Sequence, residues 1–338
     1  MSTFKKVFKK AFGLREFGVF MALIILVVVF SLTSQNFLTS KNLMNITRQV
    51  SVNALIAIGM TFVIITGGID LSVGSVVAFS GIIASSAMVD FHLPVYVAVI
   101  IGILIGSMTG LVNGVLITYL NMPAFITTMG TMTILRGLGY IYTQGYPIYN
   151  LPKAFRQIGQ GYLGTLPIPT IVLMVVALIA YVLLRRTVFG RHIYAIGGNA
   201  EAAKLMGIHV KSVNLMVYVI CGTICGIAAV VQTSRLGSGL PTVGAGYELD
   251  AIASVVIGGA AMAGGSGTII GTILGAVILG ILSNGLSLLE VDSYVMQVIS
   301  GMVVIIAVLI DELRKITSNR SQIKATRMAI KAESLKEK

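Results

Sequence analysis

Long apolar runs separated by short polar or glycine-containing joints dominate the chain. A helix needs about 20 mostly apolar residues to cross a bilayer. Ten runs approach this length and define the predicted spans: 16–34, 51–67, 71–89, 94–119, 123–143, 168–185, 212–234, 248–263, 267–288 and 293–311. The pattern predicts an all-α fold, a polytopic transmembrane helical bundle of about ten spans.

The polar remainder divides the chain into a few parts. We expect a basic tail at residues 1–15, a transmembrane domain at 16–311 and a charged tail at 312–338. Within the membrane domain, an external segment at 144–167 is rich in proline, glycine and tyrosine. A polar loop at 186–211 lies between two spans on the internal side.

Composition and charge placement agree with this layout. Only 11% of residues are charged, against about 25% in a soluble domain. The net charge of +12 raises the question of nucleic acid, but 18 of the 24 Lys and Arg residues lie in the two tails and between 185 and 211. Cytoplasmic loops carry such an excess of Lys and Arg. We therefore expect both termini and the 186–211 loop in the cytoplasm, with lipid and not nucleic acid as the surroundings.

Glycines recur at helical spacing inside several spans. They form the series Gly102, Gly106, Gly110 and Gly114, the series Gly267, Gly271 and Gly275, and the pair Gly222 and Gly226. A spacing of four places them on one helix face, where they allow close helix packing in lipid. Cys221 and Cys225 share a helix face as well, so we expect two buried thiols and no disulfide.

Gly67, Gly68 and Asp70 form a structural joint between two spans. The spacing of Gly67, Gly68, Gly74 and Ser75 is repeated in Gly264, Gly265, Gly271 and Thr272. Both joints lie on the same face in the predicted topology, so they are not an inverted repeat but two places where a helix turns at a glycine pair. Asp70 is expected to cap the helix that follows.

Catalytic and metal-binding patterns are not found in the sequence. There is no G-x-x-x-x-G-K-[ST] or His-Glu-x-x-His motif, and the three histidines are dispersed. We expect no catalytic residue, no metal site and no cofactor bound by this chain. Arg136 is the clearest mid-span charge and is expected to pair with a helix-end carbonyl or a carboxylate. Few buried carboxylates argue against ion coupling and for an external energy source.

The internal loop contains its own helix signals. Asn199 is a good N-cap, Glu201 stands in the first turn, and Gly207 is a good C-terminal stop. These residues predict a helix of about two turns with Leu205 and Ile208 on an apolar side. Taken alone, the signals fit either a docking helix for a soluble partner or a plain surface loop.

The same loop resembles a known class of proteins. Glu201-Ala202-Ala203 followed by Gly207 resembles the cytoplasmic Glu-Ala-Ala…Gly loop of ATP-binding-cassette (ABC) importer permeases. Further strings resemble the ribose-type monosaccharide permeases: Ser51-Val52-Asn53-Ala54, Gly67-Gly68-Ile69-Asp70-Leu71-Ser72-Val73-Gly74-Ser75, Gly197-Gly198-Asn199, Tyr247-Glu248-Leu249-Asp250-Ala251-Ile252-Ala253 and Asn284-Gly285-Leu286. The resemblance covers residues 17 to 311.

The resemblance implies a multi-pass subunit of the bacterial plasma (inner) membrane that imports a monosaccharide, with ribose favoured among several sugars. A second permease copy, ATP-binding cassette subunits that hold ATP and Mg, and an extracytoplasmic sugar-binding protein are the implied partners. The predicted helix becomes the element that couples the permease to the ATPase. Its residues in this role are Asn199, Glu201, Ala202, Ala203, Gly207 and Ile208.

Polar residues near predicted bends are the candidates for the translocation pathway: Asn53, Thr66, Asn113 and Asn284. Each has a structural alternative, a hydrogen bond within or between helices. The external segment 144–167 is a candidate docking surface for the sugar-binding protein. Two rival functions remain: an ion-coupled secondary sugar carrier, which needs an essential carboxylate, and a channel, which equilibrates its solute without accumulation.

Overall fold

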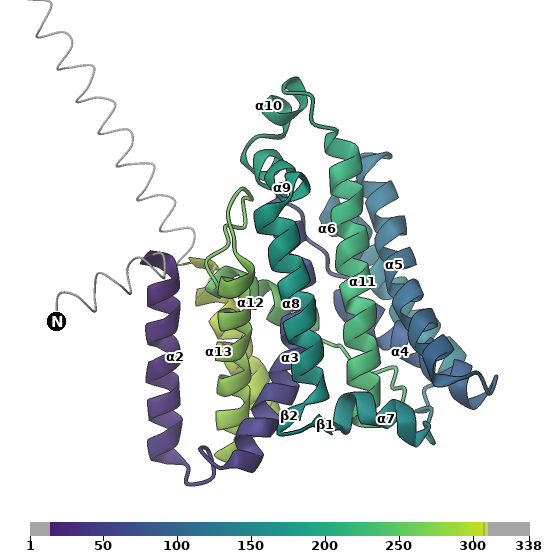
Figure 1. Cartoon of the computed structure of the whole chain (residues 1–338), viewed down its shortest axis with the longest axis vertical. Coiled ribbons are helices and arrows are strands. Elements are labelled where there is room, and N and C mark those ends of the chain that lie inside the picture. The colour runs from purple at the N-terminus through teal and green to yellow at the C-terminus, as the bar shows by residue number, and fades with distance from the viewer. Residues whose placement is uncertain (1–13, 307, 310–338) are drawn as a thin grey trace, which may run out of the picture.

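The computed structural model describes residues 14–306 and 308–309, and these form an α-helical bundle with one small sheet (Figure 1). In chain order the elements are α2 (Leu14–Thr33), α3 (Ser40–Ile65), α4 (Val73–Val89), α5 (Val95–Thr118), α6 (Ala124–Thr143), α7 (Lys153–Gln160), β1 (Tyr162–Leu163), β2 (Leu166–Pro167), α8 (Ile168–Arg186), α9 (Val188–Gly198), α10 (Ala200–Leu205), α11 (Val210–Leu236), α12 (Tyr247–Ile257) and α13 (Ile269–Leu288). A further apolar helix, Ser293–Ile306, follows α13. The predicted tails at 1–15 and 312–338 lie almost entirely outside the described residues.

Several of these helices have the length and composition of membrane spans. Five described helices are long and apolar enough to cross a bilayer: α3, α5, α8, α11 and α13. Three apolar helices are shorter, at Gly18–Thr33, Val73–Val89 and Ser293–Ile306. The prediction of an all-α membrane protein is confirmed.

Helix α3 is the centre of the bundle, and the hydropathy pattern misplaced its start. The helix begins at Ser40, not near residue 51, and Thr39 caps it by accepting a hydrogen bond from the Asn42 amide. Its first turns are polar and resemble a loop in sequence. They also have a polar partner on α13: the Asn42 and Asn284 side-chain amides exchange two hydrogen bonds of 2.9 Å.

The glycine series of α5 packs directly against α11, as predicted. A Cβ at Gly106 would overlap the Gly222 carbonyl oxygen, and one at Gly222 would overlap the Gly106 carbonyl oxygen. Gly110 meets the Tyr218 carbonyl in the same way. Cys221 is buried and forms no disulfide, which agrees with the sequence-based expectation. Backbone-to-backbone contact therefore sets the distance between these two helices.

The predicted span 248–263 is wrong, because α12 ends at Ile257. Its 11 residues make a helix of about 16 Å, roughly half of a 30 Å hydrocarbon core. The chain from 258 to 268 is not helical, and Gly259, Gly264 and Gly265 adopt positive φ angles there. The hydropathy pattern did not predict this break, because the residues on both sides of it are apolar.

The glycine series predicted for the next helix is only partly correct. Gly267 lies before α13, whereas Gly271 and Gly275 lie on the helix and pack against the Gly258 and Ser254 carbonyls. These contacts hold α12 against α13. The two helices are therefore as closely packed as α5 and α11.

The two polar segments lie at opposite ends of the bundle in Figure 1, with α9 and α10 at the top and α7, β1 and β2 at the bottom. β1 and β2 form an antiparallel pair in which Tyr162 faces Pro167. The sequence pattern missed α7 and α9. Thr187 caps the start of α9 by accepting a hydrogen bond from the Gly190 amide. The hydropathy pattern does not reveal this cap.

Gly106→Ala should destabilise the protein, since its new methyl group meets backbone atoms of α11, which cannot rotate away as a side chain can. We expect a loss of roughly 1–3 kcal/mol, seen as a lower unfolding temperature of the purified protein. Gly130→Ala is the matched control, because nothing lies within 4 Å of its Cβ position. Helix propensity should leave that variant neutral or stabilise it by up to about 1 kcal/mol. Equal unfolding temperatures for the two variants would contradict this packing account.

Candidate functional site

Helix α10 projects from one end of the molecule and has the caps that its sequence predicts (Figure 1). The Asn199 Oδ1 atom accepts a hydrogen bond of 2.9 Å from the Ala202 amide. Gly207 has a φ of +82°, and the Ile208 amide bonds to the Ala203 carbonyl at 3.1 Å. The predicted helix is confirmed, with bounds Ala200–Leu205.

The outer side of α10 offers both charge and apolar surface. Ala203 is buried and anchors the helix, while Glu201 and Ala202 are exposed. Leu205 is 89% exposed and Met206 72% exposed. Adjacent exposed apolar side chains on a projecting helix are typical of a protein contact surface.

Helix α9 connects α10 to the interior. Asn199 ends α9 and also caps α10, so the two helices share one rigid corner. At the end of α9, a Cβ on Gly197 would overlap the Ile65 carbonyl oxygen, the last carbonyl of α3. The Tyr194 hydroxyl donates a 2.7 Å hydrogen bond to the Gly267 carbonyl. These two contacts join α9 to the end of α3 and to the chain before α13.

The Tyr194 phenol is well suited to this hydrogen bond. Burial raises the pKa of Tyr194 above its ordinary value, against the opposing effect of the Arg185 charge. The phenol therefore remains a proton donor at neutral pH. The contact between α9 and the Gly267 carbonyl does not depend on ionisation.

The two similar glycine joints contact each other beneath α9. The Gly265 amide donates a 2.8 Å hydrogen bond to the Ile65 carbonyl. A Cβ on Gly264 would lie 3.0 Å from the Gly67 nitrogen. Only glycine fits because both the space and the positive φ angles exclude a side chain. The two joints, which are similar in sequence, therefore pack against each other beside Gly197.

Helices α4 and α12 begin where two backbone segments cross inside the bundle. A Cβ on Gly74 would overlap the Gly244 carbonyl oxygen, and Gly244 and Gly246 have positive φ angles. The chain reaches α4 through the turn 66–72 and reaches α12 through the non-helical segment 237–246. Two helix N-termini, each with a positive partial charge, therefore lie close together.

Polar side chains stabilise the segments that lead into these helices. Asp70 is buried, and its Oδ1 atom accepts hydrogen bonds from the Ser72 amide at 2.9 Å and the Ser72 hydroxyl at 2.6 Å. Asp70 was predicted to cap the helix that follows it. Instead it stabilises the turn before α4, and α4 itself begins without a side-chain cap. Arg136 donates to the Pro241 and Val243 carbonyls at 2.9 and 2.6 Å. The carbonyl partners of Arg136 belong to the non-helical segment 237–246 and not to a helix end.

The four candidate pathway residues lie in different surroundings. The Asn113 amide is fully buried, donates to the Ser72 hydroxyl at 3.0 Å and accepts from the Thr131 hydroxyl at 2.6 Å. Asn284 is paired with Asn42, and the Thr66 hydroxyl donates to the Val63 carbonyl. The structure does not bring the four together. Three of them make hydrogen bonds within or between helices, which was the structural alternative to a role in transport. The role of all four in transport remains a prediction.

Asn53 differs from the other three. Its side chain is half-buried and, within the described part of the chain, has no hydrogen-bond partner. It lies on α3, one helical turn beyond Gln49. Among the four candidates, Asn53 therefore retains unused donor and acceptor groups for a passing solute.

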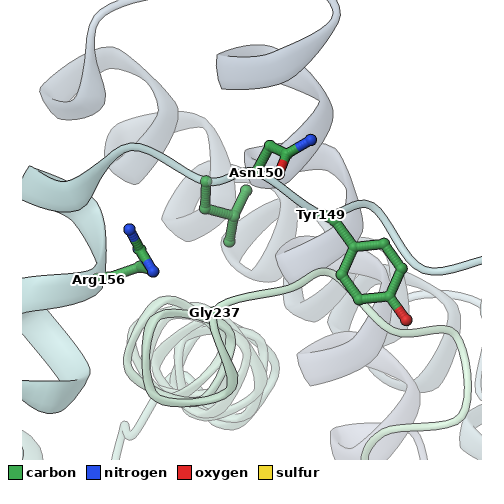
Figure 2. Close-up of a pocket in the computed structure, with 5 residues that line it drawn as sticks. Tyr149, Asn150, Arg156 and Gly237 are labelled. Atoms are coloured by element: carbon green, nitrogen blue, oxygen red, sulfur yellow. The ribbon is translucent and has the colours of Figure 1, made fainter.

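The segment 144–167 lines an open cavity of about 620 Å³ (Figure 2). Its lining consists of Tyr149, Asn150, Leu151, Arg156 and Gly237. Tyr149 and Arg156 stand on opposite sides of it in Figure 2. Ile148 and Gly239 exchange backbone hydrogen bonds of 2.9 Å, which tie this segment to the chain that leads into α12. The docking role of residues 144–167 stays a prediction.

Within the described residues, no group of three or more His, Cys, Asp or Glu side chains is arranged to hold a metal ion. The acidic groups near the helix crossing, Asp70, Glu248 and Asp250, belong to the turn before α4 and the first turn of α12. The observed chemistry of this region is hydrogen bonding and charge.

The sequence is similar to known membrane permeases. The profile of the family described as branched-chain amino acid transport system, permease component, matches residues 42–308. The ribose import permease protein of Bacillus subtilis is 48% identical over 300 residues, which is 88% of this chain and 93% of the relative. The ribose import permease protein of Escherichia coli K12 is 42% identical (92% and 98%), and the D-allose transport system permease protein of that strain is 39% identical (91% and 95%). No solved structure matches the chain.

Gly197→Ala should detach α9 and α10 from the interior, since the new methyl group collides with the Ile65 carbonyl. We expect trypsin to cleave at Lys204 roughly tenfold faster in membrane vesicles, because local opening becomes less costly. The neighbouring Gly198→Ala is the control, as its Cβ position has nothing within 4 Å. Cleavage at the same rate in both variants would show that the Gly197 contact does not hold α9 in place.

Proposed function

The chain belongs to the family of transport-system permease components, and on that premise we propose that it is the membrane subunit of an ATP-driven ABC importer for ribose. It is a transport subunit and not an enzyme. Ribose is favoured because the relatives named for ribose import have higher identity to this chain than the relative named for D-allose. The observation that carries the mechanism is α10, a capped and projecting helix joined rigidly to the interior.

We infer ten membrane spans with both termini in the cytoplasm. Nine passages are made by α2, α3, α4, α5, α6, α8, α11, α13 and the helix Ser293–Ile306. The tenth combines the half-span helix α12 with the non-helical chain 258–268 that follows it. In this topology α9 and α10 face the cytoplasm, and α7 with the β1–β2 pair faces outward. The opposite placement of these elements in Figure 1 and the basic residues between 185 and 211 support it.

The proposed partners follow from the surfaces. ATP-binding cassette subunits, which carry ATP and Mg, dock on α10 through Glu201, Leu205 and Met206. An external sugar-binding protein docks on residues 144–167, beside the Tyr149 cavity. A second permease copy completes the membrane pathway. ATP is bound and hydrolysed on the partner subunits.

Movement would pass from α10 to the broken helices through backbone contacts. Closure of the ATP-binding subunits displaces the corner at Asn199, and α9 transmits the displacement to Ile65 and Gly265. From there it reaches the turn before α4 and the chain after α12. These two segments lack helical hydrogen bonds and can absorb changes in φ and ψ, as hinges do.

Uptake of radiolabelled ribose tests the proposal directly. Cells that express this chain with its ATP-binding and sugar-binding partners are expected to accumulate ribose. Depletion of ATP should abolish accumulation, whereas collapse of the proton gradient at preserved ATP should not. Loss with the uncoupler alone would favour the ion-coupled sugar carrier, and entry without accumulation would favour a channel.

Glu201→Lys is expected to uncouple the transporter without loss of the protein from the membrane. The substitution reverses an exposed charge on α10 and places a cation at the positive end of the helix. We expect ribose uptake to fall about tenfold, which corresponds to ~1.4 kcal/mol of lost interaction with the ATP-binding subunit.

Glu290→Lys is the matched control for that experiment. Glu290 is also exposed but follows α13, away from α10, so its reversal should leave uptake near the wild-type rate. Membrane levels of both variants are measured by immunoblot. Normal uptake by Glu201→Lys would remove Glu201 from the coupling surface.

A further inference from the structure

Unpaired hydrogen-bonding atoms gather where α11 ends and α12 begins. Gln232, in the last turns of α11, is only 5% exposed. Its Nε2 atom donates a 3.0 Å hydrogen bond to the Tyr247 hydroxyl, while its buried Oε1 atom has no partner. The Oε2 atom of Glu248, the next residue of α12, is also buried without a partner. Turning the Gln232 amide over would only exchange which of its two ends is unpaired.

Charges of both signs surround these atoms without forming an ion pair among the described residues. Arg235 and Asp250 lie within electrostatic range of the Tyr247 phenol. Glu248 lies against the start of α4, since a Cβ on Gly74 would be 2.8 Å from its Oε2 atom. The site therefore lies at the crossing of the two helix N-termini. It offers open acceptors next to the positive ends of two helices.

These groups match a neutral polyhydroxylated ligand. A buried acceptor without a partner destabilises the protein, so a ligand hydroxyl that donates to Gln232 or Glu248 recovers that free energy. Sugar hydroxyls both donate and accept, which suits an amide, a phenol and charges of both signs at close quarters. Secondary transporters place their substrate sites where discontinuous helices meet inside the bundle, and the same arrangement is found here.

We propose that Gln232, Tyr247 and Glu248 form a monosaccharide-binding site at the crossing of α4 and α12, through which the sugar passes. The proposal rests on the proposed function and adds the place and the residues of sugar contact. Arg136 supports the site indirectly, as it holds the Pro241 and Val243 carbonyls in the segment that leads into α12.

Saturation-transfer NMR on the purified permease with its ATP-binding subunits, without the sugar-binding protein, tests the site. The probes are ribose, allose and xylose at millimolar concentration, with leucine as a zwitterionic comparison. We expect signals from the sugars and none from leucine. Gln232→Met, which removes the acceptor at similar volume, should reduce the sugar signal about fivefold or more. It should also reduce ribose transported per ATP hydrolysed about tenfold.

Asn214→Leu is the matched control. Asn214 also has a buried oxygen without a partner and lies on α11, but at the other end of the helix. If the two variants behave alike, the unpaired atoms only hold water and the proposal is overturned. Binding of leucine without sugars would overturn it as well.

The remaining outcomes separate the site from the function. Ribose uptake by intact cells without any sugar signal from the isolated complex would remove the site and leave the importer standing. Sugar signals lost in Gln232→Met, in a protein whose uptake is not driven by ATP, would leave the site and remove the importer. If Gln232→Met does not reach the membrane, Tyr247→Phe removes the phenol hydroxyl that Gln232 contacts and should weaken the same signals.

Discussion

The architecture depends on the close approach of polypeptide backbones at glycine. Between helices in lipid, apolar side chains gain little by leaving their lipid neighbours, so tight van der Waals contact carries the association. Glycines provide that contact between α5 and α11, between α12 and α13, and between the start of α4 and the segment before α12. At each place a single methyl group would meet backbone atoms. The distances between these elements are therefore set by backbone atoms, which cannot rotate away as side chains do.

The same constraint joins α9 and α10 to the interior of the bundle. Gly197, Gly264 and Gly265 let α9 rest on the last carbonyl of α3 and on the chain before α13. A longer side chain at this contact would act as a compliant spacer, whereas direct backbone contact passes a displacement on with little loss. Rigidity at the corner of Asn199 and freedom in the non-helical segments are complementary. In the proposed mechanism, this combination converts a push on α10 into a change at the helix crossing.

Breaking two helices inside a membrane domain exposes amides and carbonyls that lipid cannot satisfy. This protein satisfies part of that demand with its own groups: Asp70 bonds to the Ser72 turn, and Arg136 bonds to the Pro241 and Val243 carbonyls. The buried side-chain oxygens of Gln232 and Glu248 remain without a hydrogen-bond partner, and they lie beside the crossing of α4 and α12. A sugar importer needs this combination, because a site that binds too tightly would hold its solute and one with no open polar group would exclude it.

The sequence by itself determined the helical class, the positions of most spans, the glycine faces and the caps of α10. These depend on local composition and spacing, which are read without knowledge of the fold. Only the tertiary structure showed that α3 begins at Ser40 and that the polar side chains of its first turns have a partner on α13, where Asn284 pairs with Asn42. It likewise decided that α12 is half a span, and that the Gln232 amide meets Tyr247. Each of these depends on contacts between residues distant in sequence, and a hydropathy pattern carries no information on which distant groups will meet.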